Sequence, residues 1–150
     1  MIRVNWDDAQ AYVSWMGKAY SLPTEAQWEK DTRGRLGRKY PWGNGEPDRN
    51  ICNFGGANHK TVEVQKIEPQ MYGIHQMAGN VREWCVTKWQ SDYKDYEQKV
   101  DNSPEGRDAR VLRGGSWFVN RGYLRCAFRG WNLPNSRGSN FGFRVVSPGF

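Results

Sequence analysis

The 150-residue chain is long enough to bury one hydrophobic core and too short for two ordinary domains, so we expect a single domain over residues 1–150. Its 8 Trp, 7 Tyr and 6 Phe exclude a disordered chain, and no stretch has the roughly 18 apolar residues of a membrane span or resembles a signal peptide. The net charge of +6 arises entirely after residue 109, because residues 110–150 hold seven Arg, no Lys and no acid.

Two helices are predicted in the first quarter of the chain. Asn5 is a good N-cap, Asp8 stands three residues later, and apolar residues then recur at helical spacing until Gly17. Thr24 and Gln27 repeat this capping arrangement ahead of a second short helix.

The remainder is less regular. Residues 40–70 are rich in turn formers and show no sustained period. Three short segments bounded by Gly, Asn or Pro are typical of strands: residues 81–86, residues 110–112 continued by 116–117 beyond a double glycine, and residues 142–146. Two short helices, short antiparallel strands and much irregular structure predict an α+β fold.

Cysteine and histidine exclude several kinds of site. Cys52, Cys85 and Cys126 show no paired spacing, and their odd number argues against a closed disulfide framework. His59 and His75 are too few for a multi-histidine metal site. We therefore expect the cysteines to be small core residues.

Several blocks together resemble the formylglycine-generating enzyme (sulfatase-modifying factor) superfamily. They are residues 4–12 (VNWDDAQAY), 22–29 (LPTEAQWE), 40–43 (YPWG), 72–74 (YGI), 77–84 (MAGNVREW), 112–117 (LRGGSW) and 140–145 (NFGFRV). The resemblance implies a C-type-lectin-like fold over nearly the whole chain. The usual N-terminal half of the family has no counterpart here, which implies a minimal or shortened version.

The family resemblance also implies calcium ligands. Members bind Ca²⁺ at the matching positions through carbonyl, carboxamide and carboxylate oxygens, which suit a hard cation. Carried over, the ligands are the Gln76 side chain, the carbonyls of Gly79 and Val81, and Glu83, with Asn50 and Ile51 contributing to a second site. Such calcium would be structural, and no cofactor is expected to be required. From the residues alone, Glu83 is equally a buried carboxylate paired with a C-terminal arginine.

The enzymes of this family oxidise a substrate cysteine with copper, which two cysteines hold shortly after the Gly-Gly-Ser-aromatic block. Soft thiolates suit Cu(I). In this chain the two positions are occupied by Val119 and, allowing for a shorter loop, Leu124. We therefore expect no oxidase activity and no catalytic residues.

Residues 117–141 resemble the C-terminal variable region of proteins diversified by retroelements. In those proteins a reverse transcriptase rewrites adenines of Asn-type codons, and the fold displays the changed side chains to a ligand. Here aromatic, large apolar and small residues alternate with fixed ones, a mixture typical of a binding surface. The predicted ligand-binding, variable positions are Phe118, Val119, Asn120, Gly122, Tyr123, Phe128, Gly130, Trp131, Asn132, Leu133, Asn135, Ser136, Gly138, Ser139 and Asn140.

Other interpretations stay open. The chain is alternatively a non-diversified or regulatory family member whose aromatic residues in this segment are core residues, or an active cysteine oxidase. We expect a protein or surface ligand as partner rather than nucleic acid, because Arg113, Arg125, Arg129 and Arg144 lie in fixed blocks and are predicted to pair inside the fold. The cytoplasm, a phage particle and a surface reached through a partner are all compatible locations.

Overall fold

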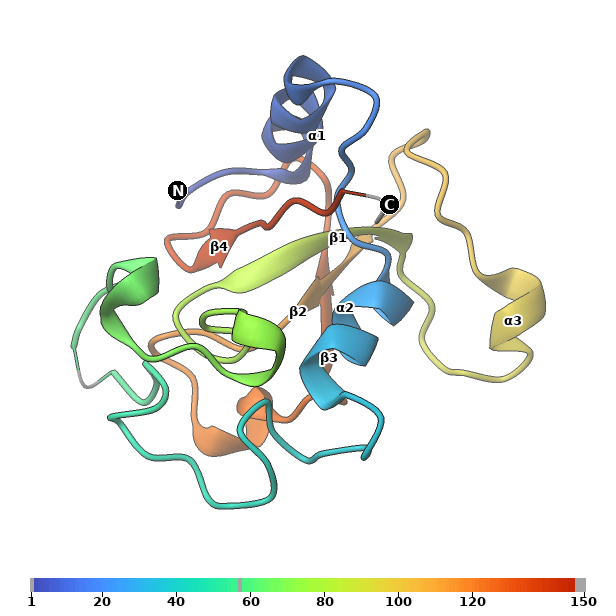
Figure 1. Ribbon diagram of the computed structural model, residues 1–150. Coiled ribbons are helices and arrows are strands. Elements are labelled where there is room, and N and C mark those ends of the chain that lie inside the picture. Colours follow the sequence, from blue (N-terminus) through green and yellow to red (C-terminus); the bar gives the residue numbers. More distant parts are fainter. Residues whose placement is uncertain (1, 57, 148–150) are drawn as a thin grey trace.

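A four-stranded mixed sheet forms the centre of the protein in the computed structural model, which describes residues 2–56 and 58–147 (Figure 1). The strands are β1 (Arg82–Lys88), β2 (Arg110–Arg113), β3 (Arg129–Asn132) and β4 (Phe141–Gly142), in the spatial order β3-β2-β1-β4. Strand β2 pairs antiparallel with both β1 and β3, whereas β4 runs parallel to β1. The α+β fold is thus confirmed, but the strands are not all antiparallel as predicted, because β4 runs parallel to β1.

The two predicted helices are present and begin at the predicted caps. The α-helices are α1 (Trp6–Met16), α2 (Glu25–Arg33) and the single turn α3 (Tyr96–Lys99), and the 3-10 turns are Val64–Lys66, Met71–Gly73 and Arg121–Leu124. Asn5 Oδ1 accepts from the Asp8 N–H at 2.8 Å, and the Asp8 carboxylate accepts from the Asn5 N–H at 3.0 Å. Thr24 and Gln27 form the same reciprocal capping box ahead of α2. Among the helices of residues 2–56 and 58–147, none has the length and apolar character needed to cross a membrane.

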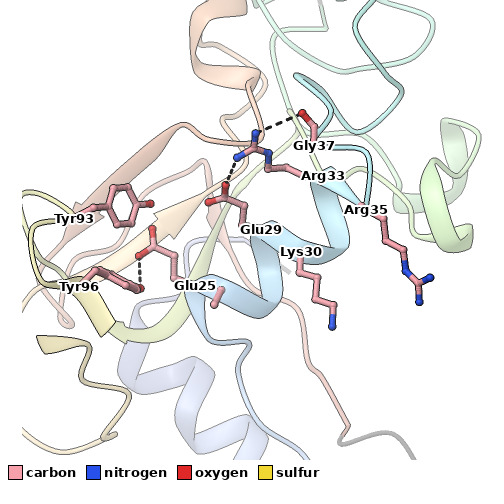
Figure 2. A pocket seen from close by; sticks show the side chains of 10 residues that line it. Glu25, Glu29, Lys30, Arg33, Arg35, Gly37, Tyr93 and Tyr96 are labelled. Atoms are coloured by element: carbon pink, nitrogen blue, oxygen red, sulfur yellow. Dashed lines mark hydrogen bonds and ion pairs between the residues drawn. The ribbon is translucent and has the colours of Figure 1, made fainter. Parts of the chain in front are cut away.

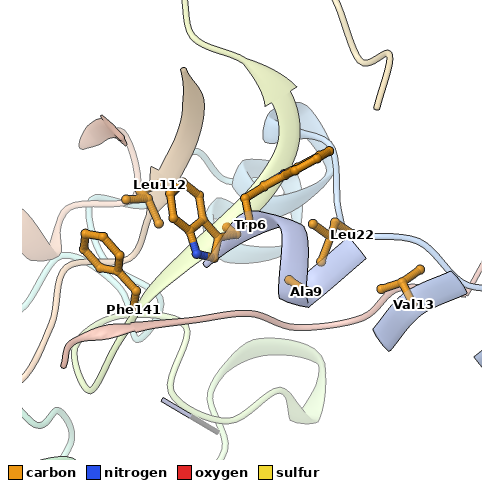
Figure 3. Packing of buried hydrophobic residues seen from close by; sticks show 7 residues of the cluster. Trp6, Ala9, Val13, Leu22, Leu112 and Phe141 are labelled. Atoms are coloured by element: carbon orange, nitrogen blue, oxygen red, sulfur yellow. The ribbon is translucent and has the colours of Figure 1, made fainter. Parts of the chain in front are cut away.

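Helices α1 and α2 cover opposite faces of the sheet. Because side chains alternate along β1, Trp84 points towards α1 and Cys85 towards α2. On the first face, Trp84 packs in one cluster with Trp6, Ala9 and Val13 of α1, Leu22, and Leu112 and Phe141 of the neighbouring strands (Figure 3). On the second face, Cys85 packs with Trp28, Met77 and Val111. The short strands are therefore sandwiched between two apolar clusters.

A third apolar cluster holds the irregular half of the chain. Tyr40, Cys52, Ala78, Val119 and Leu124 are its buried members. They come from segments far apart in the sequence, so this cluster ties the turn-rich region to the segment after β2. Irregular structure is here ordered by packing rather than by strand pairing.

The strand predictions need three corrections. Strand β2 ends at Arg113, because Gly114 and Gly115 have φ of 94° and 69° and a Cβ at Gly115 would lie 2.8 Å from the Tyr123 carbonyl oxygen. Residues 116–117 are therefore no part of a strand. Strand β4 is only Phe141–Gly142, and residue 146 makes an isolated bridge with Ser21. Strand β3 was not predicted.

Candidate functional site

Most of the predicted variable positions are accessible to solvent. Phe118 and Trp131 are 51% exposed, Leu133 is 50% exposed and Tyr123 is 36% exposed. These four large apolar side chains lie within one sequence segment, and exposed apolar side chains that gather on a surface mark interaction sites. The alternative in which these aromatic residues fill the core does not hold for Phe118, Tyr123 and Trp131.

Two of the predicted positions lie in the interior instead. Val119 is 7% exposed and packs beside Leu124 in the third cluster. Asn140 is also 7% exposed, and its Nδ2 donates to Ser116 Oγ at 3.2 Å. We therefore leave both residues out of the binding surface. The other positions are exposed or half-buried and are called the variable surface below: Phe118, Asn120, Gly122, Tyr123, Phe128, Gly130, Trp131, Asn132, Leu133, Asn135, Ser136, Gly138 and Ser139.

The backbone beneath the variable surface is held by hydrogen bonds from distant parts of the chain. The Gly56 N–H donates to the Trp117 carbonyl at 2.7 Å, and the Cys126 N–H donates to the Lys39 carbonyl at 2.9 Å. At the start of α1, a backbone N–H donates to the Pro134 carbonyl at 2.9 Å. Residues at fixed positions thus supply much of the support, and the exposed side chains between them are free to contact a ligand.

Strand β3 divides the variable surface between the two faces of the sheet. Gly130 pairs with Leu112 and Trp131 pairs with Val111. Because side chains alternate, Trp131 stands on the α2 side, where its ring centre lies 6.4 Å from that of Trp89, and Gly130 lies on the α1 side. As β3 is the last strand in the sheet order, the surface continues around this edge.

On the α2 side, a cavity of about 430 Å³ is lined by α2, Tyr93 and Tyr96 (Figure 2). Glu25 is 2% exposed and accepts from Arg129 Nε at 2.6 Å, from Arg129 Nη2 at 2.8 Å and from the Tyr96 hydroxyl at 3.1 Å. Burial, together with the charge of Glu25, raises the pKa of Tyr96. Both oxygens of the Glu25 carboxylate thus accept structural hydrogen bonds beside this cavity.

Three C-terminal arginines form ion pairs inside the fold, as predicted. Arg113 contacts Glu29, Arg129 contacts Glu25 and Arg144 contacts Glu83. The remaining four also have partners: Arg110 donates to backbone carbonyls, Arg125 to the Gly122 carbonyl, and Arg121 and Arg137 contact Glu46 and Asp8. Arg110, Arg113, Arg129 and Arg144 are therefore buried or half-buried scaffolding. Arg121, Arg125 and Arg137 are exposed, so the prediction that Arg125 pairs inside the fold is wrong.

Three of the residues implied as calcium ligands, Gln76, Val81 and Glu83, line one cavity of about 560 Å³. Gln76 Nε2 donates to the carbonyls of Glu63 and Val64, both at 2.7 Å. Gln76 Oε1 is buried and has no hydrogen-bond partner among the described residues, so this oxygen suits a cation.

Glu83 does not suit a cation in the same way. Its Oε2 accepts from Arg144 Nε at 2.6 Å and from Trp28 Nε1 at 2.7 Å, and its Oε1 accepts from Arg144 Nη2 at 2.7 Å. Burial alone would lower the pKa of Arg144, but attraction to Glu83 outweighs it and the pKa is raised. The implied ligand set therefore does not fit calcium while Arg144 occupies this carboxylate.

The remaining implied ligands lie in irregular backbone. Gly79, whose carbonyl is the implied ligand, donates its N–H to the Gly114 carbonyl at 2.6 Å. In the predicted second site, the Asn50 side chain is exposed and the Ile51 carbonyl accepts from Gln70 Nε2 at 3.3 Å. Within the described part of the chain, no three His, Cys, Asp or Glu side chains gather into a metal-binding group.

The two positions that the family resemblance implies for the copper-binding cysteines lie together. Val119 and Leu124 belong to the same buried cluster. Cys52, Cys85 and Cys126 are free and buried. Burial raises the pKa of Cys52 and Cys126 to about 12 and raises that of Cys85 as well, so all three remain neutral thiols near pH 7.

Sequence reasoning missed two residues beside the variable surface. Trp89 approaches Trp131, and the guanidinium carbon of Arg82 lies 5.8 Å from the ring centre of Tyr123. Strand alternation could have indicated the orientation of Arg82. Because Glu83 points to the α2 side of the sheet, Arg82 beside it in β1 points to the α1 side.

Comparison with known proteins agrees with this architecture. The chain matches the model of the sulfatase-modifying factor enzyme 1-like domain over residues 1–148. It is 38% identical over 168 residues to the formylglycine-generating enzyme of Thermomonospora curvata, an alignment that covers 98% of this chain and 55% of that protein. Variable protein 1 of Treponema denticola is 36% identical with a TM-score of 0.71, over 84% of this chain and 46% of that chain. PvdO from Pseudomonas aeruginosa is 26% identical with a TM-score of 0.81, over 96% and 60% of the two chains.

The chain spans about half the length, or less, of the curated relatives it matches. The family match nevertheless includes both capping boxes, the sheet and the variable surface, because it extends from residue 1 to residue 148. The chain therefore belongs to the sulfatase-modifying factor enzyme 1-like family.

Proposed function

We propose that this domain is a non-catalytic recognition module that binds a protein or another surface ligand through the variable surface. The observation that carries the proposal is the exposure of Phe118, Tyr123, Trp131 and Leu133 on a backbone anchored from distant segments. Exposed aromatic side chains provide large contact areas at low entropic cost. The similarity to Treponema denticola variable protein 1 supports the same interpretation.

The contrast between several fixed positions and most variable ones supports diversification of this surface. The fixed residues Leu124 and Pro134 are buried and Arg129 is ion-paired, whereas the variable Tyr123 and Trp131 are exposed. Substitutions at exposed positions usually change stability by less than about 0.5 kcal/mol. The domain would therefore tolerate many different side chains on this surface.

The proposal that the domain is not catalytic rests on the lack of side chains that could bind copper. Aliphatic side chains at Val119 and Leu124 offer no ligand to copper, and the thiol of Cys126 is buried. Oxidase activity is the second candidate function, because the chain is 38% identical to a formylglycine-generating enzyme. It is tested by Cu(I) titration and by turnover of a cysteine-containing peptide, and measurable turnover would overturn the non-catalytic proposal.

Alanine substitutions test the recognition surface directly. The probe is a random peptide library displayed on phage and selected on the wild-type domain. Phe118→Ala, Tyr123→Ala and Trp131→Ala should each weaken binding of the selected peptides by about 10-fold or more, while Tm changes little. Trp15→Ala is the matched control, because Trp15 is 79% exposed on α1 and outside the variable surface. Peptides that bind all three variants as tightly as wild type would refute the proposal.

Diversification itself is tested at the DNA level. The flanking DNA should contain a near-identical repeat of the codons for residues 117–143 that differs only at adenines, next to a reverse transcriptase gene. Their absence in complete flanking DNA would favour a non-diversified or regulatory member of the family.

A further inference from the structure

Arg82 reaches the variable surface from a fixed position in the sheet. It is the first residue of β1, its Cα pairs with that of Phe141, and its N–H donates to the Asn140 carbonyl at 2.7 Å. Its Nη1 comes within 3.6 Å of the place where a Cβ of Gly130 would lie, and its guanidinium carbon is 5.8 Å from the Tyr123 ring centre. Arg82 thus lies beside two variable positions without being one.

The Arg82 side chain has no hydrogen bond and no ion pair within residues 2–56 and 58–147, and its Nε is buried. Burial lowers its pKa, and only Tyr123 opposes this effect. Arg113, Arg129 and Arg144, which are also buried or half-buried, each have a carboxylate. Arg82 therefore differs from the ion-paired arginines in lacking an acidic partner.

An unpartnered guanidinium at a partly buried position is costly to the fold. Taking a charge out of water without supplying a hydrogen-bonded counter-charge is unfavourable, and protein interiors normally avoid it. An apolar side chain of similar size would be cheaper at this position. The missing carboxylate is therefore expected to come from outside the chain.

We propose that Arg82 is a constant anchor of the variable surface and binds a carboxylate of an acidic peptide segment on a protein partner. The inference rests on the recognition function proposed above. The planar guanidinium binds a carboxylate through two parallel hydrogen bonds, and the rings of Tyr123 and Phe128, whose centres are 4.7 Å apart, lie beside the site. The variable side chains then determine which acidic segment is accepted.

A protein carboxylate fits this site better than nucleic acid. Binding to a phosphate backbone depends on several unpaired cations, each of which neutralises a phosphate. Five of the seven arginines between residues 110 and 144 contact a carboxylate, and Arg110 is buried. Among the described residues of this segment, Arg125 is therefore the one exposed arginine without an acidic partner, and the surface beside Arg82 has few unneutralised cations.

Thermal unfolding separates an anchor from a structural residue. Arg82→Met should raise Tm by about 2 to 4 °C, because it replaces an unpartnered charge with an apolar side chain. Arg129→Met is the matched control and should lower Tm by about 6 °C or more, because it leaves Glu25 buried without its partner. If Arg82→Met lowers Tm as much as Arg129→Met does, Arg82 is structural and the proposal is wrong.

A small carboxylate tests the chemistry without knowledge of the partner. The Nε–H resonance of Arg82, assigned by its loss in Arg82→Met, is followed during titration with N-acetylglutamate. It should shift saturably with a millimolar Kd, and the isosteric N-acetylglutamine should cause no such shift. An equal response to both compounds, or no saturation by about 100 mM N-acetylglutamate, overturns the proposal. Tighter saturation by inorganic phosphate overturns the carboxylate assignment in favour of a phosphorylated ligand.

Peptide selection separates this inference from the proposed function. Peptides selected on the wild-type domain should be enriched in Asp and Glu, and Arg82→Met and Arg82→Lys should bind them at least 10-fold more weakly. Peptides that need Tyr123 and Trp131 but show no acidic enrichment refute the anchor and leave the recognition surface intact. Peptides indifferent to Tyr123 and Trp131 refute the recognition surface, and the N-acetylglutamate titration then still decides the role of Arg82.

Discussion

Arg144 holds Glu83 through two parallel hydrogen bonds, from Nε to Oε2 at 2.6 Å and from Nη2 to Oε1 at 2.7 Å. Trp28 Nε1 from α2 donates to the same carboxylate at 2.7 Å. The arrangement joins the C-terminal segment, β1 and α2 at one point. The sequence-based prediction that Glu83 is a buried carboxylate paired with a C-terminal arginine is confirmed.

Glu83→Gln should therefore destabilise the fold by about 3–5 kcal/mol, because it leaves a mostly buried guanidinium without its counter-charge. Urea unfolding measures the loss. The control is Glu46→Gln, whose contacts with Lys39 and Arg121 are exposed and should contribute little to stability. In the double variant Glu83→Gln/Arg144→Gln, the loss should be smaller than the sum of the single losses, since neither charge is left alone. Additive losses would contradict a direct pair.

A smaller effect is expected at the α2 cap. Thr24→Ala removes the oxygen that accepts from the Gln27 N–H at 3.1 Å, and the free energy of unfolding should fall by about 1 kcal/mol. Thr24→Asn retains an acceptor and should recover most of the loss. If Thr24→Asn destabilises as much as Thr24→Ala, the capping bond is not the cause.

These caps illustrate what sequence predicts well. The hydrogen bonds at Asn5 and Thr24 join residues three apart, so residue types and spacing are sufficient to predict both helices. Strand β3 has no such signal: it contains a glycine, and its partner β2 lies well upstream in the chain. Its strand character comes from pairing with β2 and from the Arg129 ion pair, which are tertiary effects.

The residues of the candidate site also fall into those that the sequence predicts and those that it does not. Exposed aromatic positions were predicted because their composition is unusual for a solvated loop. Val119 and Asn140 were misplaced on the surface, since an irregular segment has no period from which inward and outward residues can be read. Arg82 was missed because its importance depends on the absence of a partner, which only the three-dimensional arrangement reveals.

Added calcium is expected to leave the thermal stability of the domain unchanged. Because Arg144 already occupies the Glu83 carboxylate, the implied set keeps only the Gln76 oxygen and the carbonyls of Gly79 and Val81, too few for an ion that takes six to eight oxygens. Differential scanning fluorimetry with millimolar CaCl₂ should give the same Tm as with EDTA. A saturable rise in Tm that Gln76→Ala abolishes would show that the calcium ligands implied by the family are functional here.

The buried thiols should make the fold sensitive to alkaline pH. Burial raises the pKa of Cys52 from 9.0 to about 12, so in the unfolded chain this thiol loses its proton near pH 9, whereas the folded protein retains it until about pH 12. Above pH 9 the unfolded state therefore binds fewer protons, and stability falls as pH rises, by up to about 1.4 kcal/mol per pH unit for each thiol. Below pH 9 the thiol is protonated in both states, so its contribution to stability is fully present. The pKa values of Tyr93 and Tyr96 are also raised from 10.0, so their effect begins at higher pH, and urea unfolding between pH 8.5 and 9.5 reports mainly on the thiols. Cys52→Ala should reduce the slope in this window, and an identical slope in Cys52→Ala and wild type would show that Cys52 does not contribute.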